Sequence, residues 1–113
     1  MFETDGFKIT KGLTDAIMQR QHVLSNNLAN IETKGFVRQD IDFNSVLSGL
    51  KTSNGFEDNE SVISRSRYKD SNPMTIEAEM SKLYDNHLRY MLLVKSISHH
   101  YEHMKKALEV RAS

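Results

Sequence analysis

Residues 75–110 read TIEAEMSKLYDNHLRYMLLVKSISHHYEHMKKALEV. Apolar or aromatic residues recur along this stretch at alternating spacings of four and three, with His87 as the exception. The series consists of Ile76, Met80, Leu83, His87, Tyr90, Val94, Ile97, Tyr101, Met104 and Leu108. A repeat of about 3.5 residues keeps side chains on one side of a helix that winds around a partner, as in a left-handed coiled coil. The stretch therefore predicts one long helix with a packing seam.

Both ends of this predicted helix carry residues that stabilise helix ends. Thr75 follows Pro73 and is a suitable N-cap, while Glu77 and Glu79 place negative charge in the first turn. Positive charge gathers near the C-terminal end, at Lys105, Lys106 and Arg111. The charges therefore suit the helix dipole.

The predicted helix is too long for its own chain to cover. At about 1.5 Å per residue, residues 75–110 span roughly 54 Å, about twice the diameter of a compact domain of this size. A second apolar group widens the apolar surface beyond the seam and consists of Leu88, Met91, Leu92 and Leu93. We expect other subunits to cover this surface, with the middle of the helix meeting more than one neighbour.

A shorter apolar stripe near the N-terminus predicts a second helix over residues 10–31. Its members lie three, four or seven residues apart and are expected to belong to the same subunit-packing surface as the seam, namely Leu13, Ile17, Leu24, Leu28 and Ile31. Gly35 follows closely and gives the chain a place to leave helical geometry. Together the two stretches predict an all-α fold. In it, the terminal amphipathic helices form a coiled-coil-like antiparallel bundle that neighbouring subunits complete.

The chain is expected to be one structural unit with three parts. Residues 1–35 carry the N-terminal helix, residues 36–74 an irregular middle segment, and residues 75–113 the long C-terminal helix. Five apolar residues of the middle segment predict a short extended stretch and a helical turn that dock on the bundle, namely Phe36, Ile41, Phe43, Val46 and Leu47. Beyond them we expect a mobile loop, since residues 54–71 predict no regular element.

Composition excludes several classes of function. The 113 residues contain 15 lysines and arginines and 15 aspartates and glutamates, so no net field attracts nucleic acid or an anionic membrane. The absence of cysteine excludes disulfides and thiolate chemistry. The N-terminus lacks the layout of a secretory signal, and the longest apolar run, Tyr90 to Val94, is far below the roughly 20 residues that span a bilayer. We expect protein partners and no direct membrane insertion.

Histidines in the long helix are the strongest candidates for metal chemistry. His99 and His103 share one helix face a turn apart, a spacing that can bind zinc, with His100 and Glu102 between them. No third ligand is evident, and histidines near a helix C-terminus also suit the dipole. The favoured interpretation is a partly solvated polar face, with a metal site as the alternative.

Other polar groups also have a structural interpretation. His87 is expected to set the register of the packing seam rather than to catalyse a reaction. Asp40 and Asp42 share one face of an extended stretch, and solvation or helix capping is favoured over a catalytic carboxylate pair. Nearby acidic residues balance a small basic cluster of Arg65, Arg67 and Lys69. No catalytic set is therefore predicted.

Three asparagines, Asn26, Asn27 and Asn30, lie near the end of the first predicted helix, although asparagine is a poor helix former. One interpretation is a fraying helix end. The other is that the amide side chains bond to neighbouring backbone or to other subunits. The sequence favours neither.

Residues 25–36, SNNLANIETKGF, resemble the signature N-N-[LI]-A-N-x-x-T-x-G-[FY] of the flagellar rod, hook and hook-associated axial proteins. The matching residues are Asn26, Asn27, Leu28, Ala29, Asn30, Thr33, Gly35 and Phe36. Lys34 replaces the proline that usually precedes the glycine. Three further stretches are most similar to proximal rod proteins of the FlgB type, at residues 19–21 (QRQ), 40–43 (DIDF) and 88–90 (LRY).

This resemblance implies a non-catalytic structural subunit of the bacterial flagellum basal body. The subunit would belong to the hollow rod that transmits torque from motor to hook, at the proximal end beside the export gate and the MS ring. Implied partners are further copies of the chain, other rod proteins, the rod-to-MS-ring adaptor and the export gate. The resemblance also implies a periplasmic rod location, flagellar type III export without a cleaved signal peptide, and no cofactor or small-molecule substrate.

Two other classes of protein fit the residue pattern. A soluble coiled-coil adaptor or secretion chaperone would also have long amphipathic helices, but would fold as a discrete, stable oligomer. A metal-binding protein or enzyme would depend on the histidine cluster and would bind stoichiometric zinc that His99→Ala abolishes.

Overall fold

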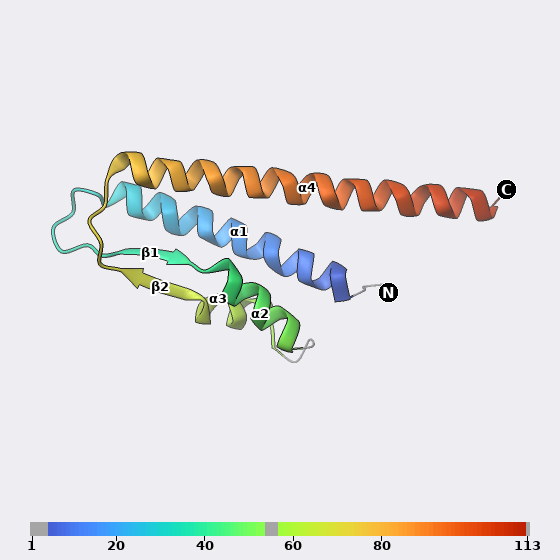
Figure 1. The fold of residues 1–113 in the computed structure, drawn as a ribbon, viewed down its shortest axis with the longest axis horizontal. Coiled ribbons are helices and arrows are strands. Elements are labelled where there is room, and N and C mark those ends of the chain that lie inside the picture. Colours follow the sequence, from blue (N-terminus) through green and yellow to red (C-terminus); the bar gives the residue numbers. More distant parts are fainter. Residues whose placement is uncertain (1–4, 54–56, 113) are drawn as a thin grey trace.

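The computed structural model describes residues 5–53 and 57–112. These residues form four helices and two short strands, and helix predominates (Figure 1). In chain order the elements are α1 (Asp5–Ala29), β1 (Arg38–Ile41), α2 (Phe43–Ser53), α3 (Asn59–Arg65), β2 (Arg67–Asp70) and α4 (Ile76–Ala112). The expected predominance of helix is confirmed. The all-α class needs one correction, because β1 and β2 pair in a small sheet.

The long C-terminal helix, α4, is present as predicted. It is 37 residues long and contains neither glycine nor proline, while Pro73 lies just before it. Thr75 caps the helix, because the backbone N–H of Ala78 donates to Thr75 Oγ1 at 3.1 Å. At about 1.5 Å per residue, α4 is roughly 55 Å long. No helix in the described part of the chain has the length and apolar character needed to cross a bilayer.

The N-terminal helix, α1, packs antiparallel to α4 (Figure 1). Two hydrogen bonds fix the opposite directions of the helices. The side-chain amide of Asn86 donates to Ile17 O at 3.0 Å, while that of Asn27 donates to Glu79 Oε2 at 3.3 Å. The helix begins and ends a little earlier than predicted, at Asp5 and Ala29.

The final part of α4 extends past the N-terminal end of α1 (Figure 1). Every residue from 98 to 111 is exposed, and we call this segment the overhang. The molecule measures 65 × 29 × 16 Å. Its radius of gyration of 17.4 Å exceeds the value of about 13 Å expected for a compact chain of this length. The predicted excess length of the C-terminal helix therefore makes the molecule elongated.

The middle segment is more regular than expected. β1 and β2 pair antiparallel, with Arg38 opposite Asp70 at one end. α2 follows β1 closely and corresponds to the expected docked stretch, whereas residues 59–70 form α3 and β2 instead of a mobile loop. Strands of four residues are too short to produce a recognisable alternation of polar and apolar residues. Residues 54–56 of the expected loop lie outside the described residues.

The hydrophobic core lies between α1 and the middle segment. Its buried members are Ala16, Val23, Ile41, Val46 and Ile63, with Leu13, Phe43 and Leu50 packed against them. Two glycines permit close packing of α2. A Cβ at Gly12 would lie 2.7 Å from Leu50 Cδ1, and a Cβ at Gly49 would lie 2.6 Å from Val62 Cγ1. α1 thus has two covered faces, one against this core and one against α4.

Candidate functional site

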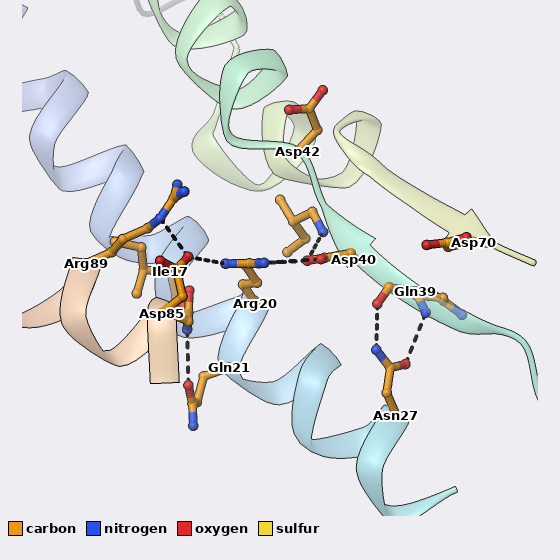
Figure 2. Close-up of polar contacts among 12 residues, drawn as sticks. Ile17, Arg20, Gln21, Asn27, Gln39, Asp40, Asp42, Asp70, Asp85 and Arg89 are labelled. Carbon is orange, nitrogen blue, oxygen red and sulfur yellow. Dashed lines mark hydrogen bonds and ion pairs between the residues drawn. The ribbon is translucent and has the colours of Figure 1, made fainter. Parts of the chain in front are cut away.

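A buried ionic network joins α1 to β1. Arg20 of α1 donates from Nε to Asp40 Oδ1 at 2.7 Å and from Nη2 to Asp40 Oδ2 at 3.2 Å (Figure 2). On β1, Arg38 Nη2 lies 3.6 Å from Asp40 Oδ2. Asp40 is only 3% exposed, so the expectation that it is solvated or caps a helix is wrong. Its partner Arg20 lies 20 residues earlier in the chain, so the local sequence pattern does not reveal the ion pair.

Glu79 brings the start of α4 into the same network. Arg38 donates from Nε to Glu79 Oε1 and from Nη1 to Asp70 Oδ2, the second bond at 2.9 Å. Glu79 is 1% exposed, although its place in the first turn of the helix predicted only a favourable interaction with the dipole. One ionic network therefore connects α1, β1, β2 and α4.

The network shifts the pKa values of its members. Burial alone would raise the pKa of Asp40, but hydrogen bonds from Arg20 and from the backbone N–H of Ile41, with the charges of Arg20 and Arg38, lower it. Burial would lower the pKa of Arg38, yet its hydrogen bond and attraction to Glu79 outweigh burial and raise it. Both groups therefore stay charged at neutral pH, which suits a structural role rather than proton transfer.

Asn27 of the axial-protein motif bonds to the backbone of β1. Its Nδ2 donates to Gln39 O at 2.7 Å, and its Oδ1 accepts from the Gln39 N–H at 3.0 Å (Figure 2). The side chain is almost fully buried, with the residue 1% exposed. For Asn27, the interpretation that its amide bonds to neighbouring backbone is confirmed, and the helix end does not fray at this position.

The other motif residues shape the turn between α1 and β1. Asn30 donates from Nδ2 to Asn26 O at 2.9 Å, and Thr33 Oγ1 donates to Asn30 Oδ1 at 3.1 Å. Gly35 has a φ of 81°, in the left-handed region that favours glycine. Of the apolar motif residues, Leu28 and Phe36 are half-buried and Ala29 is exposed. The motif therefore consists of the last turn of α1 and the turn that follows it, and Asn27 attaches this segment to the sheet.

A second polar cluster joins α4 to α1 and to the first residue of α2. Arg89 donates from Nε to Asp85 Oδ2 at 3.2 Å, and Asp85 Oδ2 lies 3.7 Å from Arg20 Nη1 (Figure 2). Both guanidinium groups face the Phe43 ring, with Cζ of Arg89 at 4.8 Å and Cζ of Arg20 at 5.9 Å from its centroid. Arg20, Phe43 and Arg89 come from the three stretches that resemble proximal rod proteins, and they meet here.

Most of the packing seam is uncovered in the single chain. Leu83 and Ile97 are half-buried. The other eight members are exposed, namely Ile76, Met80, His87, Tyr90, Val94, Tyr101, Met104 and Leu108. The most buried residues of α4, Glu79 and Asn86, are polar and lie outside the seam. α4 therefore meets its own chain along an adjacent face and leaves the seam available.

The remaining apolar residues of the two helices differ in burial. In the second apolar group of α4, Leu88, Met91 and Leu92 are 41%, 42% and 68% exposed, and Leu93 is half-buried. In the stripe of α1, all members are buried or half-buried, namely Leu13, Ile17, Leu24, Leu28 and Ile31. The apolar surface of α1 is thus largely satisfied within the chain, whereas that of α4 is not.

His99 and His103 lie side by side on the overhang. Their rings are stacked, with centroids 6.4 Å apart and an interplanar angle of 24°, and both side chains are exposed. With Glu102 they have the H-x-x-E-H spacing of one class of zinc peptidase, but that chemistry requires a third ligand and a cleft. Within residues 5–53 and 57–112, no group of three histidine, aspartate or glutamate residues is arranged to hold a metal ion.

Two further polar groups have local structural roles. Asp42 caps α2, because its Oδ1 accepts from the Asn44 N–H at 3.1 Å and its Oδ2 accepts from Ser45 Oγ at 2.9 Å. The capping interpretation is therefore confirmed for Asp42. In the basic cluster, Arg65 forms an ion pair with Glu57, which leaves it less able to contact a phosphate.

Comparison with known proteins adds no assignment. No protein-family model matches the sequence, and no curated protein matches it.

Proposed function

We propose that this chain is a non-catalytic structural subunit of the bacterial flagellar rod, the hollow shaft that transmits torque from motor to hook. Its place is the proximal end of the rod, beside the export gate and the MS ring. The observation that carries the proposal is the exposed packing seam on a helix that extends past the rest of its own chain.

The seam is an unusual surface for a protein that works alone. Tyr101 and Leu108 are 67% and 62% exposed, and Val94 is 38% exposed. Monomeric proteins rarely leave a long contiguous apolar surface in water, and large patches mark interaction sites. Burial of apolar surface contributes about 25 cal/mol per Å². The physical consequence is association along α4, which forms the coiled-coil-like bundle only when neighbouring subunits supply the missing helices.

The geometry of the motif supports the choice of the rod over other helical assemblies. Asn27 has two specific backbone partners, and Gly35 has a backbone conformation that other residues rarely adopt. Two positions of the axial-protein signature therefore have a physical reason for their residue type. Arg20, Phe43 and Arg89, from the stretches that resemble proximal rod proteins, form one contact cluster.

The proposed function implies a route of export and a set of protein partners. The chain would be exported by the flagellar type III system without a cleaved signal peptide and would assemble in the periplasm. Its neighbours would be further copies, other rod proteins, the rod-to-MS-ring adaptor and the export gate. It would need no cofactor and no small-molecule substrate.

Purified basal bodies provide the direct test. The chain should co-purify with the rod in stoichiometric amounts, and cells that lack it should stop building rods at the stage of the MS ring. Re-expression of the chain should restore both rods and swimming. Normal rods in cells that lack the chain would overturn the proposal.

The same exposed seam also fits a soluble coiled-coil adaptor or secretion chaperone. That alternative requires a discrete oligomer in which the seam is covered. Size-exclusion chromatography with light scattering separates the two functions. A subunit of the rod should be monomeric and incompletely helical before assembly, whereas an adaptor should form a stable, fully helical oligomer.

A further inference from the structure

The histidine pair on the overhang is a chemical feature that the proposed rod function does not use. His99 and His103 are spaced i, i+4 on α4, with ring centroids 6.4 Å apart. From the sequence, a partly solvated polar face is favoured over a metal site, because no third ligand is evident and histidines near a helix C-terminus suit the dipole. In the single chain both imidazoles are exposed, as is every residue of the overhang around them.

We propose that His99 and His103 together form a two-imidazole binding site for a divalent transition metal ion such as Zn²⁺ or Cu²⁺. Imidazole nitrogen is a preferred ligand of both ions. Two histidines one turn apart on a helix supply two ligands from one face, which is the arrangement that helical zinc motifs use. The proposal stands independently of the rod function.

The geometry requires only side-chain rotation. Zinc–nitrogen bonds are about 2.0–2.1 Å long, so one ion between two imidazoles brings the ring centroids to roughly 5–6 Å. The stacked rings at 6.4 Å must therefore approach by a small amount. Both side chains are exposed, so no packed neighbour opposes this rotation. The helix backbone already supplies the spacing, and the site forms without refolding.

The pair lies away from the packing seam. His99 and His103 each follow a seam residue by two positions, after Ile97 and Tyr101. Two positions on an α-helix correspond to about 200° of rotation. The imidazoles therefore point away from the side of α4 on which the seam packs. Association through the seam alone therefore leaves the metal site accessible, whereas a second neighbour on the face of Leu88 and Leu92 would approach the histidines.

The surrounding charges set the strength of the site. Glu102 lies between the two histidines and attracts a cation, whereas Lys95 and Lys106, one turn away on either side, repel it. Two protein ligands leave the remaining coordination positions to water, unlike a structural zinc site with four protein ligands. The site is therefore weaker than a structural zinc site, and it should bind Cu²⁺ more tightly than Zn²⁺.

Binding should also strengthen the helix in the overhang. An ion held by residues i and i+4 links two successive turns, and every residue of the overhang from 98 to 111 is exposed, so little burial holds these turns. Metal binding should therefore raise the helical circular dichroism of the chain and slow amide exchange around residues 99–103. A site elsewhere on the molecule would not produce this local protection.

Metal titration of the full chain, without a histidine tag, tests the proposal. Calorimetry should show one Zn²⁺ or Cu²⁺ ion per chain, and histidine ring signals in NMR spectra should identify His99 and His103. His99→Gln and His103→Gln should each weaken binding by about tenfold or more, since loss of a ligand exceeds loss of an outer-shell partner. The matched control is His100→Gln, which removes a neighbouring exposed imidazole and should leave the affinity unchanged.

Each contrary result overturns the proposal. Wild-type affinity in both His99→Gln and His103→Gln would show that the ion binds elsewhere. An equal loss in His100→Gln would show nonspecific binding by the histidine-rich segment. All three variants change exposed positions, and circular dichroism without metal confirms that they fold as the wild type does.

Discussion

Asn27 shows how one side chain can replace a neighbouring strand. The N–H and C=O of Gln39 both bond to the same amide, as they would to a residue on an adjacent strand. The amide group offers a donor and an acceptor in one plane, whereas a carboxylate offers only acceptors and an alanine offers neither. The chemistry of this one contact therefore specifies asparagine at the end of α1.

Substitution of Asn27 should reveal this requirement. Asn27→Ala should lower the free energy of unfolding by about 1–3 kcal/mol, because the Gln39 backbone loses both partners. Asn27→Asp should cost more, because its carboxylate would replace an amide nitrogen that lies 3.3 Å from Glu79 Oε2. Denaturant unfolding measures both effects. The control is Asn26→Ala, at the exposed neighbouring position, which should change the free energy of unfolding by about 0.5 kcal/mol or less. Equal losses of stability at the two positions would contradict the requirement for an amide at Asn27.

Asp40 should make the fold sensitive to acid. Its pKa in the folded chain lies below its ordinary value of 3.8, so the unfolded chain binds a proton more readily as the pH falls. The stabilisation from Asp40 is therefore complete above that ordinary value and is lost as the pH falls from it through the folded pKa. Unfolding free energies measured across this acidic range should decrease with falling pH.

The variant Asp40→Asn isolates this contribution. At neutral pH it should destabilise the chain by about 3–5 kcal/mol, because buried arginine charges lose their partner. Its stability should then depend less on pH in the acidic range than that of the wild type. An unchanged slope would show that other carboxylates cause the acid sensitivity.

Local sequence predicted the residues whose partners are close in the chain. Thr75 and Asp42 cap helices through residues two or three positions away, and both roles follow from general capping preferences. Arg38 and Glu79 are 41 residues apart, and no local pattern indicates that they meet. The ionic network could therefore not be predicted, although the acidic and basic residues that form it were visible.

At the level of elements, the two long helices and their antiparallel packing were predictable, but the residues that make their contact were not. The apolar periodicity of α4 identified an amphipathic helix of nearly the correct length. The residues that α4 buries most deeply are Glu79 and Asn86, which a search for apolar faces does not select. The extended stretch that contains Ile41 was expected and is β1, whereas β2 and α3 were missed because each is short and depends on tertiary contacts with the rest of the chain.

The overhang should be the least protected part of α4 in the isolated chain. Residues 98–111 have no buried side chains to support their hydrogen bonds, and isolated helical segments of this length are marginal in water. Their amides should exchange faster with deuterium than those of residues 79–93, and mass spectrometry of the monomer can compare the two segments. Equal protection would indicate that the overhang is stable without a partner.

At the level of the whole molecule, the chain has two unlike ends. The sheet and the turn after α1 lie near the start of α4, while the overhang projects from the opposite end (Figure 1). Glu79 joins the ionic network to the same end of α4. The molecule is 65 Å long along one axis and 16 Å along another, so it is elongated rather than globular. The sequence predicted this elongation from helix length alone, but not the small sheet at one end.

Val94→Asp should separate folding from assembly. Val94 is 38% exposed in the single chain, so the variant should retain nearly wild-type thermal stability. In an assembly that packs the seam, however, the carboxylate would be desolvated without a partner, and rods and swimming should be lost. The control is Ser96→Asp, which adds the same charge about 200° around the helix. Normal swimming with Val94→Asp would refute the packing of the seam.

The hydrogen bonds of Glu79 restrict the orientation of α4 near its start. The distance from Glu79 to the end of the helix is roughly 50 Å, so a tilt of about 5° at Glu79 would displace the C-terminal end by about 4 Å. An apolar contact at that point would tolerate sliding, whereas the hydrogen bonds of Arg38 and Asn27 to one carboxylate admit a single orientation. The direction of the distant tip is therefore set by polar contacts nearer the start of α4, namely those of Glu79, Asp85 and Asn86 with β1 and α1.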